Sequence, residues 1–264
     1  MKLFYSPGAC SLSPNIVAHE AGINLRLQKV DLKTKTIETE GDFLALNPKG
    51  YVPALQLDNG EVLTEGPVIV QYLADLKPES GLAPPAGTNE RYRLQEMLGY
   101  VNSEIHKTYS PLFRPNTPPE VQAERKEHLL KRYALIDQQL QGRQYLLGER
   151  FSVADAYLFT VTTWAAKVKV DLSKFGHLHA FQERTSARPA VVAALKATVL
   201  IFRLAMTVDS AASHSRECFS TGFRGTPVVL CAGRSAALSH VFRFLLPFPK
   251  TIQIDLHFST GKSQ

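Results

Sequence analysis

The sequence contains few cysteines, and none of them has a partner at the spacing of a redox dithiol. Only Cys10, Cys218 and Cys231 occur among 264 residues, far apart along the chain. This pattern argues against a disulfide framework and favours a reducing compartment. Pro7 and Ser13 stand where a C-x-x-C partner of Cys10 would be needed. Any disulfide exchange at Cys10 therefore needs a second sulfur from outside the chain, and a small-molecule thiol is the natural candidate.

Long apolar runs are also missing. No stretch approaches the roughly 20 residues of a membrane span, and the strand-like start lacks the apolar core of a secretory signal. We therefore expect a cytoplasmic protein with no membrane partner. The net charge is +6, but residues 198–264 hold seven basic and three acidic residues, a balance of +4. The basic charge belongs mainly to this tail and does not indicate a nucleic-acid partner for the folded body.

The first residues bring a thiol to the start of a helix. Residues 1–5 form a short apolar run typical of a buried strand, and a Pro-Gly turn follows. Ser11 or Ser13 is placed to cap the helix behind Cys10. The free N–H groups at a helix N-terminus stabilise a thiolate, so we expect a lowered pKa for Cys10. The alternative is a small buried thiol without a chemical role. We favour the reactive thiol, because strand, turn, cysteine and helix occur together.

The remaining patterns predict an α/β domain followed by an all-α domain. Residues 1–77 follow the order β-α-β-α-β-β-α, with a hairpin signal at 58–60. Proline and glycine crowd residues 78–87, which we interpret as a linker. Residues 88–197 show helical spacing of apolar side chains throughout.

Capping boxes mark two of the predicted helix starts. One begins at Thr117, with Glu120 three residues later, and the other pairs Ser152 with Asp155. Residues 198–264 show no sustained apolar period, so we expect a poorly structured or non-native extension. It is either a genuine appendage or the product of a shifted or read-through reading frame, and we favour the second interpretation.

Two further places suit a small thiol ligand with amino-acid character. A cis proline at Val52-Pro53 would leave the backbone N–H and C=O of Val52 free to pair with an extended peptide. The helix start at Glu65-Gly66 can receive a carboxylate, and the Glu65 side chain an ammonium group. The alternatives are an ordinary edge-strand turn and a first-turn acid that serves the helix dipole.

Three basic residues are further candidates for contact with this ligand. Lys35 lies in a polar loop, and His106-Lys107 lie near the end of the first helix of the second domain. Solvated charges and a structural histidine are the alternatives. His106 gains a chemical role if the cleft between the domains brings it over Cys10.

These residues, in this order, resemble the beta-class (bacterial) glutathione transferases over residues 1–197. The segments that carry the resemblance are Met1-Lys2-Leu3-Phe4-Tyr5, Pro7-Gly8-Ala9-Cys10-Ser11, Asn47-Pro48-Lys49-Gly50, Val52-Pro53-Ala54-Leu55, Leu63-Thr64-Glu65-Gly66, Gln71-Tyr72-Leu73-Ala74-Asp75, His106-Lys107, Pro111-Leu112-Phe113-Arg114-Pro115 and Ala154-Asp155-Ala156-Tyr157-Leu158-Phe159. The resemblance implies a thioredoxin-like first domain, an all-helical second domain, glutathione as co-substrate and a homodimer.

The resemblance also implies roles for single residues. Cys10 lies against the glutathione sulfur and can form a mixed disulfide with it, and His106 supports catalysis from the helical domain. Other glutathione contacts are implied at Lys35, Val52, Glu65, Gly66, Lys107, Ser103 and Glu104, the last two partly across the dimer interface. Gly99 stands where members often carry an asparagine that contacts glutathione, so one polar contact is expected to be missing.

We therefore expect a glutathione S-transferase that conjugates glutathione to small hydrophobic electrophiles. Tyr109, Leu112 and Phe113 are the predicted acceptor site, and no metal site is indicated. A glutathione-dependent peroxidase or disulfide-reductase activity of Cys10 is a second hypothesis. A glutathione-binding module without turnover, such as a regulatory partner, is a third.

Overall fold

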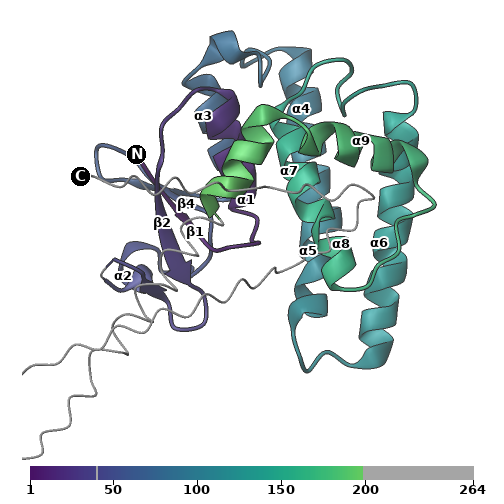
Figure 1. Cartoon of the computed structure of the whole chain (residues 1–264), viewed down its shortest axis with the longest axis horizontal. Helices are drawn as coiled ribbons and strands as arrows, with labels where there is room; N and C mark the ends of the chain where they lie inside the picture. Colours follow the sequence, from purple (N-terminus) through teal and green to yellow (C-terminus); the bar gives the residue numbers. More distant parts are fainter. Residues whose placement is uncertain (40, 199–264) are drawn as a thin grey trace, which may run out of the picture. The chain divides into compact units, whose positions relative to one another are not determined.

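A five-stranded mixed sheet is built from the first part of the chain (Figure 1). The computed structural model describes residues 1–39 and 41–198, and the expectations for the tail beyond Thr198 lie outside these residues. The strand order is β3-β2-β1-β4-β5, with β1 and β2 parallel and the other neighbouring pairs antiparallel. The strands are β1 (Lys2–Tyr5), β2 (Arg26–Asp31), β3 (Thr36–Ile37), β4 (Ala54–Gln56) and β5 (Val62–Thr64).

Alternation along β1 and β4 gives the sheet two apolar faces. Leu3 and Leu55 belong to the large core with α1 (Leu12–Glu20) and α3 (Gly66–Asp75). Their neighbour Phe4 points to the opposite face, into a smaller cluster with Phe43 of α2 (Phe43–Leu46). Successive side chains of a strand point to opposite faces, so each strand serves both clusters. The order β-α-β-α-β-β-α is confirmed, with the short β3 as an unpredicted addition.

Helices make up the rest of the described chain. A 3-10 turn (Pro78–Ser80) lies between α3 and α4, and a second 3-10 turn (Ser110–Phe113) follows α5. A π-helical turn, Val101–His106, connects α4 directly to α5. The helices are α4 (Asn89–Tyr100), α5 (Lys107–Tyr109), α6 (Pro119–Leu140), α7 (Val153–Thr162), α8 (Trp164–Lys167), α9 (Gly176–Ser186) and a last helix whose described residues are 189–198. The predicted fold class, α/β followed by all-α, is confirmed.

Helix α7 joins the two parts of the fold. All ten of its residues are buried, and it packs against α1 and α3 as well as α4. Its start carries the predicted capping box, because the Asp155 carboxylate accepts hydrogen bonds from the N–H and the hydroxyl of Ser152, at 2.8 and 2.6 Å. Asp155 also accepts from the Leu146 N–H at 2.8 Å. Burial nevertheless raises the pKa of Asp155 to about 6.

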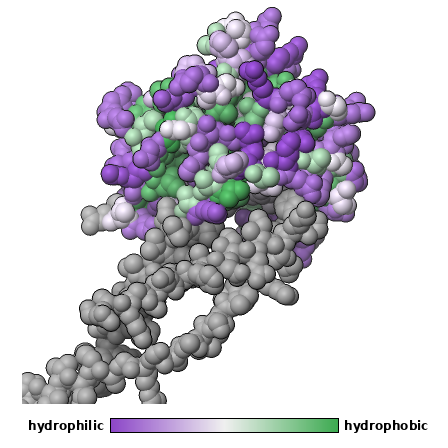
Figure 2. Space-filling view, turned by 45° about the horizontal axis from the view of Figure 1, so that its top comes forward, coloured by the Kyte–Doolittle hydropathy of each residue, from purple (hydrophilic) through white to green (hydrophobic). Residues whose placement is uncertain are grey.

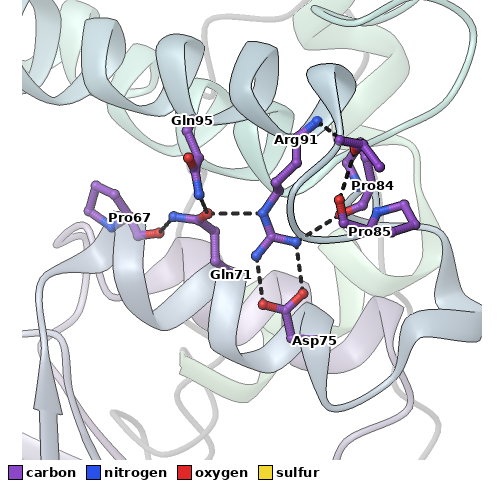
Figure 3. Close-up of polar contacts among 8 residues, drawn as sticks. Pro67, Gln71, Asp75, Pro84, Pro85, Arg91 and Gln95 are labelled. Atoms are coloured by element: carbon purple, nitrogen blue, oxygen red, sulfur yellow. Dashed lines mark hydrogen bonds and ion pairs between the residues drawn. The ribbon is translucent and has the colours of Figure 1, made fainter.

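A polar network fastens α3 to α4 across the predicted linker (Figure 3). The Arg91 side chain, only 5% exposed, donates to both Asp75 carboxylate oxygens at 2.8 and 2.6 Å. It also donates to the Pro84 carbonyl at 2.8 Å and to Gln71 Oε1 at 3.2 Å. Gln95 donates to the same Gln71 oxygen at 3.1 Å. The described residues lie in one compact unit, so the domain boundaries at 77 and 88 stay predictions.

Two predicted helix caps are wrong. Ser11 is the N-cap of α1 but makes no side-chain capping bond, because its hydroxyl faces the backbone of Ser6. Ser13 donates instead to the Cys10 carbonyl at 2.9 Å. Helix α6 begins one residue later than predicted, with Pro118 as N-cap, and the Thr117 hydroxyl donates to the Pro111 carbonyl at 2.6 Å. In each case a nearby backbone carbonyl outside the helix accepts from the hydroxyl instead.

The exposed surface of the described residues is mainly hydrophilic, because most of the large apolar side chains lie in the core. Figure 2 shows a face on which hydrophilic residues predominate and apolar ones form scattered patches. No helix among residues 1–39 and 41–198 is long and apolar enough to cross a membrane.

Candidate active site

A cleft of about 360 Å³ contains six of the predicted site residues. These six are Cys10, Lys35, Val52, His106, Tyr109 and Phe113. Residues that our sequence analysis did not assign to the site also line it, among them Ser6, Leu32, Tyr51 and Trp164. A larger hollow of about 720 Å³ lies at the Met1 edge of the sheet, and its lining holds none of the predicted residues. The smaller cleft is therefore the candidate site.

Cys10 lies where the sequence predicts it, but its thiol is not in the expected state. The turn after β1 gives Gly8 a φ of 73° and places Cys10 two residues before α1. The half-buried thiol donates to the Val52 carbonyl at 3.2 Å. Burial raises the pKa of Cys10 to about 12, although the backbone N–H groups of Cys10 and Ser11 act in the lowering direction. The expected low pKa is wrong, because desolvation outweighs the field of the helix start.

The Val52 backbone is only partly available to a ligand. The Val52-Pro53 peptide bond is cis, as predicted. The Val52 carbonyl already accepts from Cys10, so the expectation that both backbone groups lack a partner is wrong for the carbonyl. The Val52 N–H has no acceptor among the described residues. A carbonyl oxygen has two lone pairs, so a second donor has room beside the thiol.

Glu65 and Gly66 lie together at the start of α3, outside the lining of the cleft. Glu65 has a φ of 69°, and its carboxylate pairs with Lys49 Nζ at 2.9 Å. This ion pair, which no local motif predicts, holds the carboxylate that we expected to receive an ammonium group. The negative charge of Glu65 acts in the direction that raises the pKa values of Cys10 and His106. This carboxylate therefore contributes to the electrostatics of the site although it does not line the cleft.

His106 stands in the cleft as a neutral ring. Its Nδ1 lies 2.5 Å from the Tyr157 hydroxyl, and its ring meets the Trp164 indole edge-on with centroids 4.9 Å apart. Burial, followed by the positive charge of Lys107, lowers the pKa of His106 to about 4, against the opposing charge of Glu65. The imidazole is therefore uncharged at neutral pH and can accept a proton or a hydrogen bond.

An aromatic wall faces the thiol turn. The Trp164 ring contacts those of Tyr109 and Phe113, each at 5.5 Å between centroids. Trp164 Nε1 donates to the Gly8 carbonyl at 3.0 Å, which ties α8 to the Cys10 turn. No local motif marks Trp164, so its place in the site was not predicted from the sequence. Leu112 does not line the cleft and packs against the core instead.

The other predicted residues lie apart from the cleft lining. Ser103 donates to the Gly99 carbonyl at 3.0 Å, and Glu104 pairs with Arg132 at 2.6 Å. Lys107 is exposed. The predicted glutathione contacts of these residues stay predictions. Lys35 does line the cleft, with its Nζ donating to the Gly50 carbonyl at 3.0 Å.

Comparison with known proteins shows the family. The glutathione S-transferase N-terminal domain matches residues 8–76, and the C-terminal domain of the same family matches residues 100–189. The chain is 46% identical over 197 residues to glutathione S-transferase GstA of Escherichia coli O157:H7, which covers 75% of this chain and 98% of GstA.

Solved structures extend the likeness to three dimensions. A sphingomonad glutathione S-transferase complexed with glutathione is 48% identical, with a TM-score of 0.74 over 76% of this chain and 100% of that one. A bacterial beta-class transferase of Sphingomonas chungbukensis is 47% identical, with a TM-score of 0.73 over 75% of this chain and 98% of the other. The chain belongs to the glutathione S-transferase family.

Proposed function

We propose that this protein conjugates glutathione to small apolar electrophiles in the cleft between the Cys10 turn and the aromatic wall. The observation that carries the proposal is the cleft itself. It joins the thiol and the Val52 backbone of the sheet domain to His106 and an aromatic surface of the helical part. Family membership and the likeness to a transferase solved with glutathione support glutathione as the co-substrate.

Glutathione has polar partners both in the lining of this cleft and outside it, at the start of α3. The Val52 N–H, which has no acceptor in the described part of the chain, can donate to the backbone of the cysteinyl residue. Gly66 begins the ten-residue helix α3, whose N-terminus favours a carboxylate. The ammonium group of the ligand would share Glu65 with Lys49, and a carboxylate has enough lone pairs for both. Lys35 supplies a positive charge for the glycyl carboxylate.

The reaction needs the thiol of glutathione as a nucleophile. The neutral His106 accepts a hydrogen bond from this thiol and favours release of its proton. The Cys10 thiol can turn its single proton from the Val52 carbonyl to the sulfur anion that forms. The sulfur then bonds to the electrophilic carbon, and the leaving group departs with the electrons of the broken bond. A pKa of about 4 makes His106 a weak base, so its contribution lies at the low end of the general-base range.

A glutathione-dependent disulfide-reductase or peroxidase activity is the second candidate, favoured by the free thiol of Cys10 in the cleft. The raised pKa of the Cys10 thiol weighs against this second activity, because the thiolate is the form that attacks a disulfide or a peroxide. A glutathione-binding module without turnover remains the third.

The proposal is tested with glutathione and a panel of halo-aromatic, epoxide and organic-hydroperoxide acceptors. Conjugation that survives in Cys10→Ala, with loss of disulfide reduction, separates the first two activities. Binding to glutathione resin without turnover of any acceptor would contradict both and support the non-catalytic module.

We also propose a cytoplasmic homodimer. Ser103 is exposed and Glu104 half-exposed on the turn that carries His106, as a contribution across an interface requires. Analytical ultracentrifugation measures the mass directly, and a monomer at micromolar concentration would contradict this assembly.

A further inference from the structure

Three hydrogen-bonded side chains, Asn102, Tyr157 and His106, connect an exposed turn to the lining of the cleft. The Tyr157 hydroxyl donates to Asn102 Oδ1 at 2.8 Å and lies 2.5 Å from His106 Nδ1. Tyr157 is 1% exposed on the fully buried helix α7, whereas Asn102 is exposed. The hydroxyl therefore links a rigid buried position to an imidazole at the candidate site.

The direction of these bonds follows from counting protons. A tyrosine hydroxyl has one proton to donate, and here Asn102 receives it. The bond to His106 Nδ1 must then be donated by the ring, so Nδ1 carries the proton of the neutral imidazole. His106 Nε2, on the other side of the ring, is left with a lone pair and has no partner among the described residues.

We propose that Tyr157, oriented by Asn102, is a positioning residue that keeps the proton of His106 on Nδ1 and presents Nε2 to the cleft as a hydrogen-bond acceptor. This rests on the proposed function, in which the thiol of glutathione is the donor to Nε2. With the opposite tautomer, Nε2–H would be a donor and could not accept from the thiol. The tyrosine therefore decides whether His106 can assist the reaction.

The local backbone supports this assignment. Asn102 and His106 belong to the same π-helical turn, in which the Lys107 N–H donates to the Asn102 carbonyl five residues earlier. Such turns are rare and occur frequently at functional sites. The Trp164 edge contact holds the imidazole plane from the cleft side. Both neighbours of Tyr157 in the chain of bonds thus come from one turn, and their spacing is set by its geometry.

Nitrogen-15 NMR of the full chain tests the tautomer without any substrate. The His106 ring resonances are assigned by their loss in His106→Gln. We expect the wild type to carry its proton on Nδ1. In Asn102→Ala the Tyr157 proton is released and can be donated to Nδ1, so the His106 proton should move to Nε2. In Asn102→Asp a carboxylate still accepts from Tyr157, so the proton should stay on Nδ1.

Kinetics supply the second readout. Loss of the acceptor at Nε2 should lower kcat/KM for conjugation about tenfold in Asn102→Ala, the effect of one hydrogen bond, with most of the activity retained in Asn102→Asp. Tyr157→Phe keeps the ring, removes the hydroxyl, and should lose activity with a mixture of tautomers. The matched control is Tyr133→Phe, another buried tyrosine, whose hydroxyl lies 2.9 Å from that of Tyr109 and is bonded to neither His106 nor Asn102 among the described residues. This variant should change neither readout.

A wild-type His106 with its proton on Nε2 would overturn the proposal, as would an Asn102→Ala protein with an unmoved proton and unchanged kcat/KM. Equal losses in Tyr157→Phe and Tyr133→Phe, without tautomer change, would assign both tyrosines a purely structural role. If the wild type conjugates no acceptor, the proposed function fails, while the NMR result still decides the tautomer. The two failures are therefore distinguishable.

Discussion

Replacing Arg91 by methionine should destabilise the protein by loosening the junction between α3 and α4. Methionine keeps an unbranched apolar stem, so the cavity is small, but it removes the four hydrogen bonds that the guanidinium donates. Among the residues at this junction, Arg91 is the one that joins α3, the segment before α4 and α4 itself in one network (Figure 3).

The size of the effect follows from the exposure of each partner. The Asp75 side chain is 51% exposed, so water replaces Arg91 and the lost ion pair costs about 1 kcal/mol. The Pro84 carbonyl loses a donor inside the junction, which costs about 1–3 kcal/mol. Gln71 keeps its bond from Gln95 and adds little. The free energy of unfolding should therefore fall by about 2–4 kcal/mol.

Thermal unfolding followed by circular dichroism measures the change. For a chain of this size each kcal/mol corresponds to about 2–4 °C, so Tm should fall by about 5–15 °C. The Tm of Arg91→Lys should lie between those of the wild type and Arg91→Met, because an ammonium group keeps the charge but cannot reproduce the forked contact of a guanidinium. The matched control is Arg93→Met on the same helix, whose pair with Glu96 is exposed and whose loss should leave Tm unchanged. Equal Tm values for Arg91→Met and the Arg93→Met control would show that the Arg91 network does not stabilise this junction.

Three further predictions concern the site and the tail. Glu65→Ala should weaken glutathione binding about ten- to a hundred-fold in calorimetry by removing a charge-assisted bond, and an unchanged affinity would exclude Glu65 from the site. His106 has a folded-state pKa of about 4, below its ordinary 6.5. Its stabilising contribution, up to about 3 kcal/mol, is thus present above pH 6.5 and is lost as the pH falls towards 4. Urea unfolding of wild type and His106→Gln across this range should show the difference shrinking, and the opposite pH dependence of Asp155, whose pKa is raised, cancels in the comparison. A constant difference would contradict a buried neutral imidazole. Finally, a chain that ends at Ala197 should be soluble, dimeric and at least as active as the full chain. Loss of folding or of glutathione binding on truncation would show that the tail is an integral part of the protein.

The sequence by itself determined the order of the elements and several of their ends. The hairpin at Asp58-Asn59-Gly60 and the box at Ser152 and Asp155 were predicted correctly. The thioredoxin-like and helical parts were likewise predicted, from apolar spacing and from the resemblance to a family. These signals are local, since turn chemistry and apolar spacing act within a few residues of the chain.

Some local signals were nevertheless misleading or silent. The hydroxyls at Ser11 and Thr117 suit helix capping but bond to loop groups that the fold brings near. The π-helical turn at Val101–His106 has no signature in the sequence, because it holds neither proline nor glycine and Val101 and Ile105 continue the apolar spacing of α4. Trp164, which no local motif marks, lines the cleft and donates to the carbonyl of Gly8, 156 residues away.

Only the tertiary structure decided the electrostatics of the site. Cys10 occupies the helix start that the sequence predicts, yet its thiol stays protonated because burial outweighs the backbone N–H groups. Its hydrogen bond to Val52 joins residues 42 positions apart. The neutral state of His106 likewise depends on burial and on Tyr157, which lies 51 residues further along the chain. The loss of water around a group is a property of everything that packs against it, so a pKa in this cleft is set only when the helices close over the sheet.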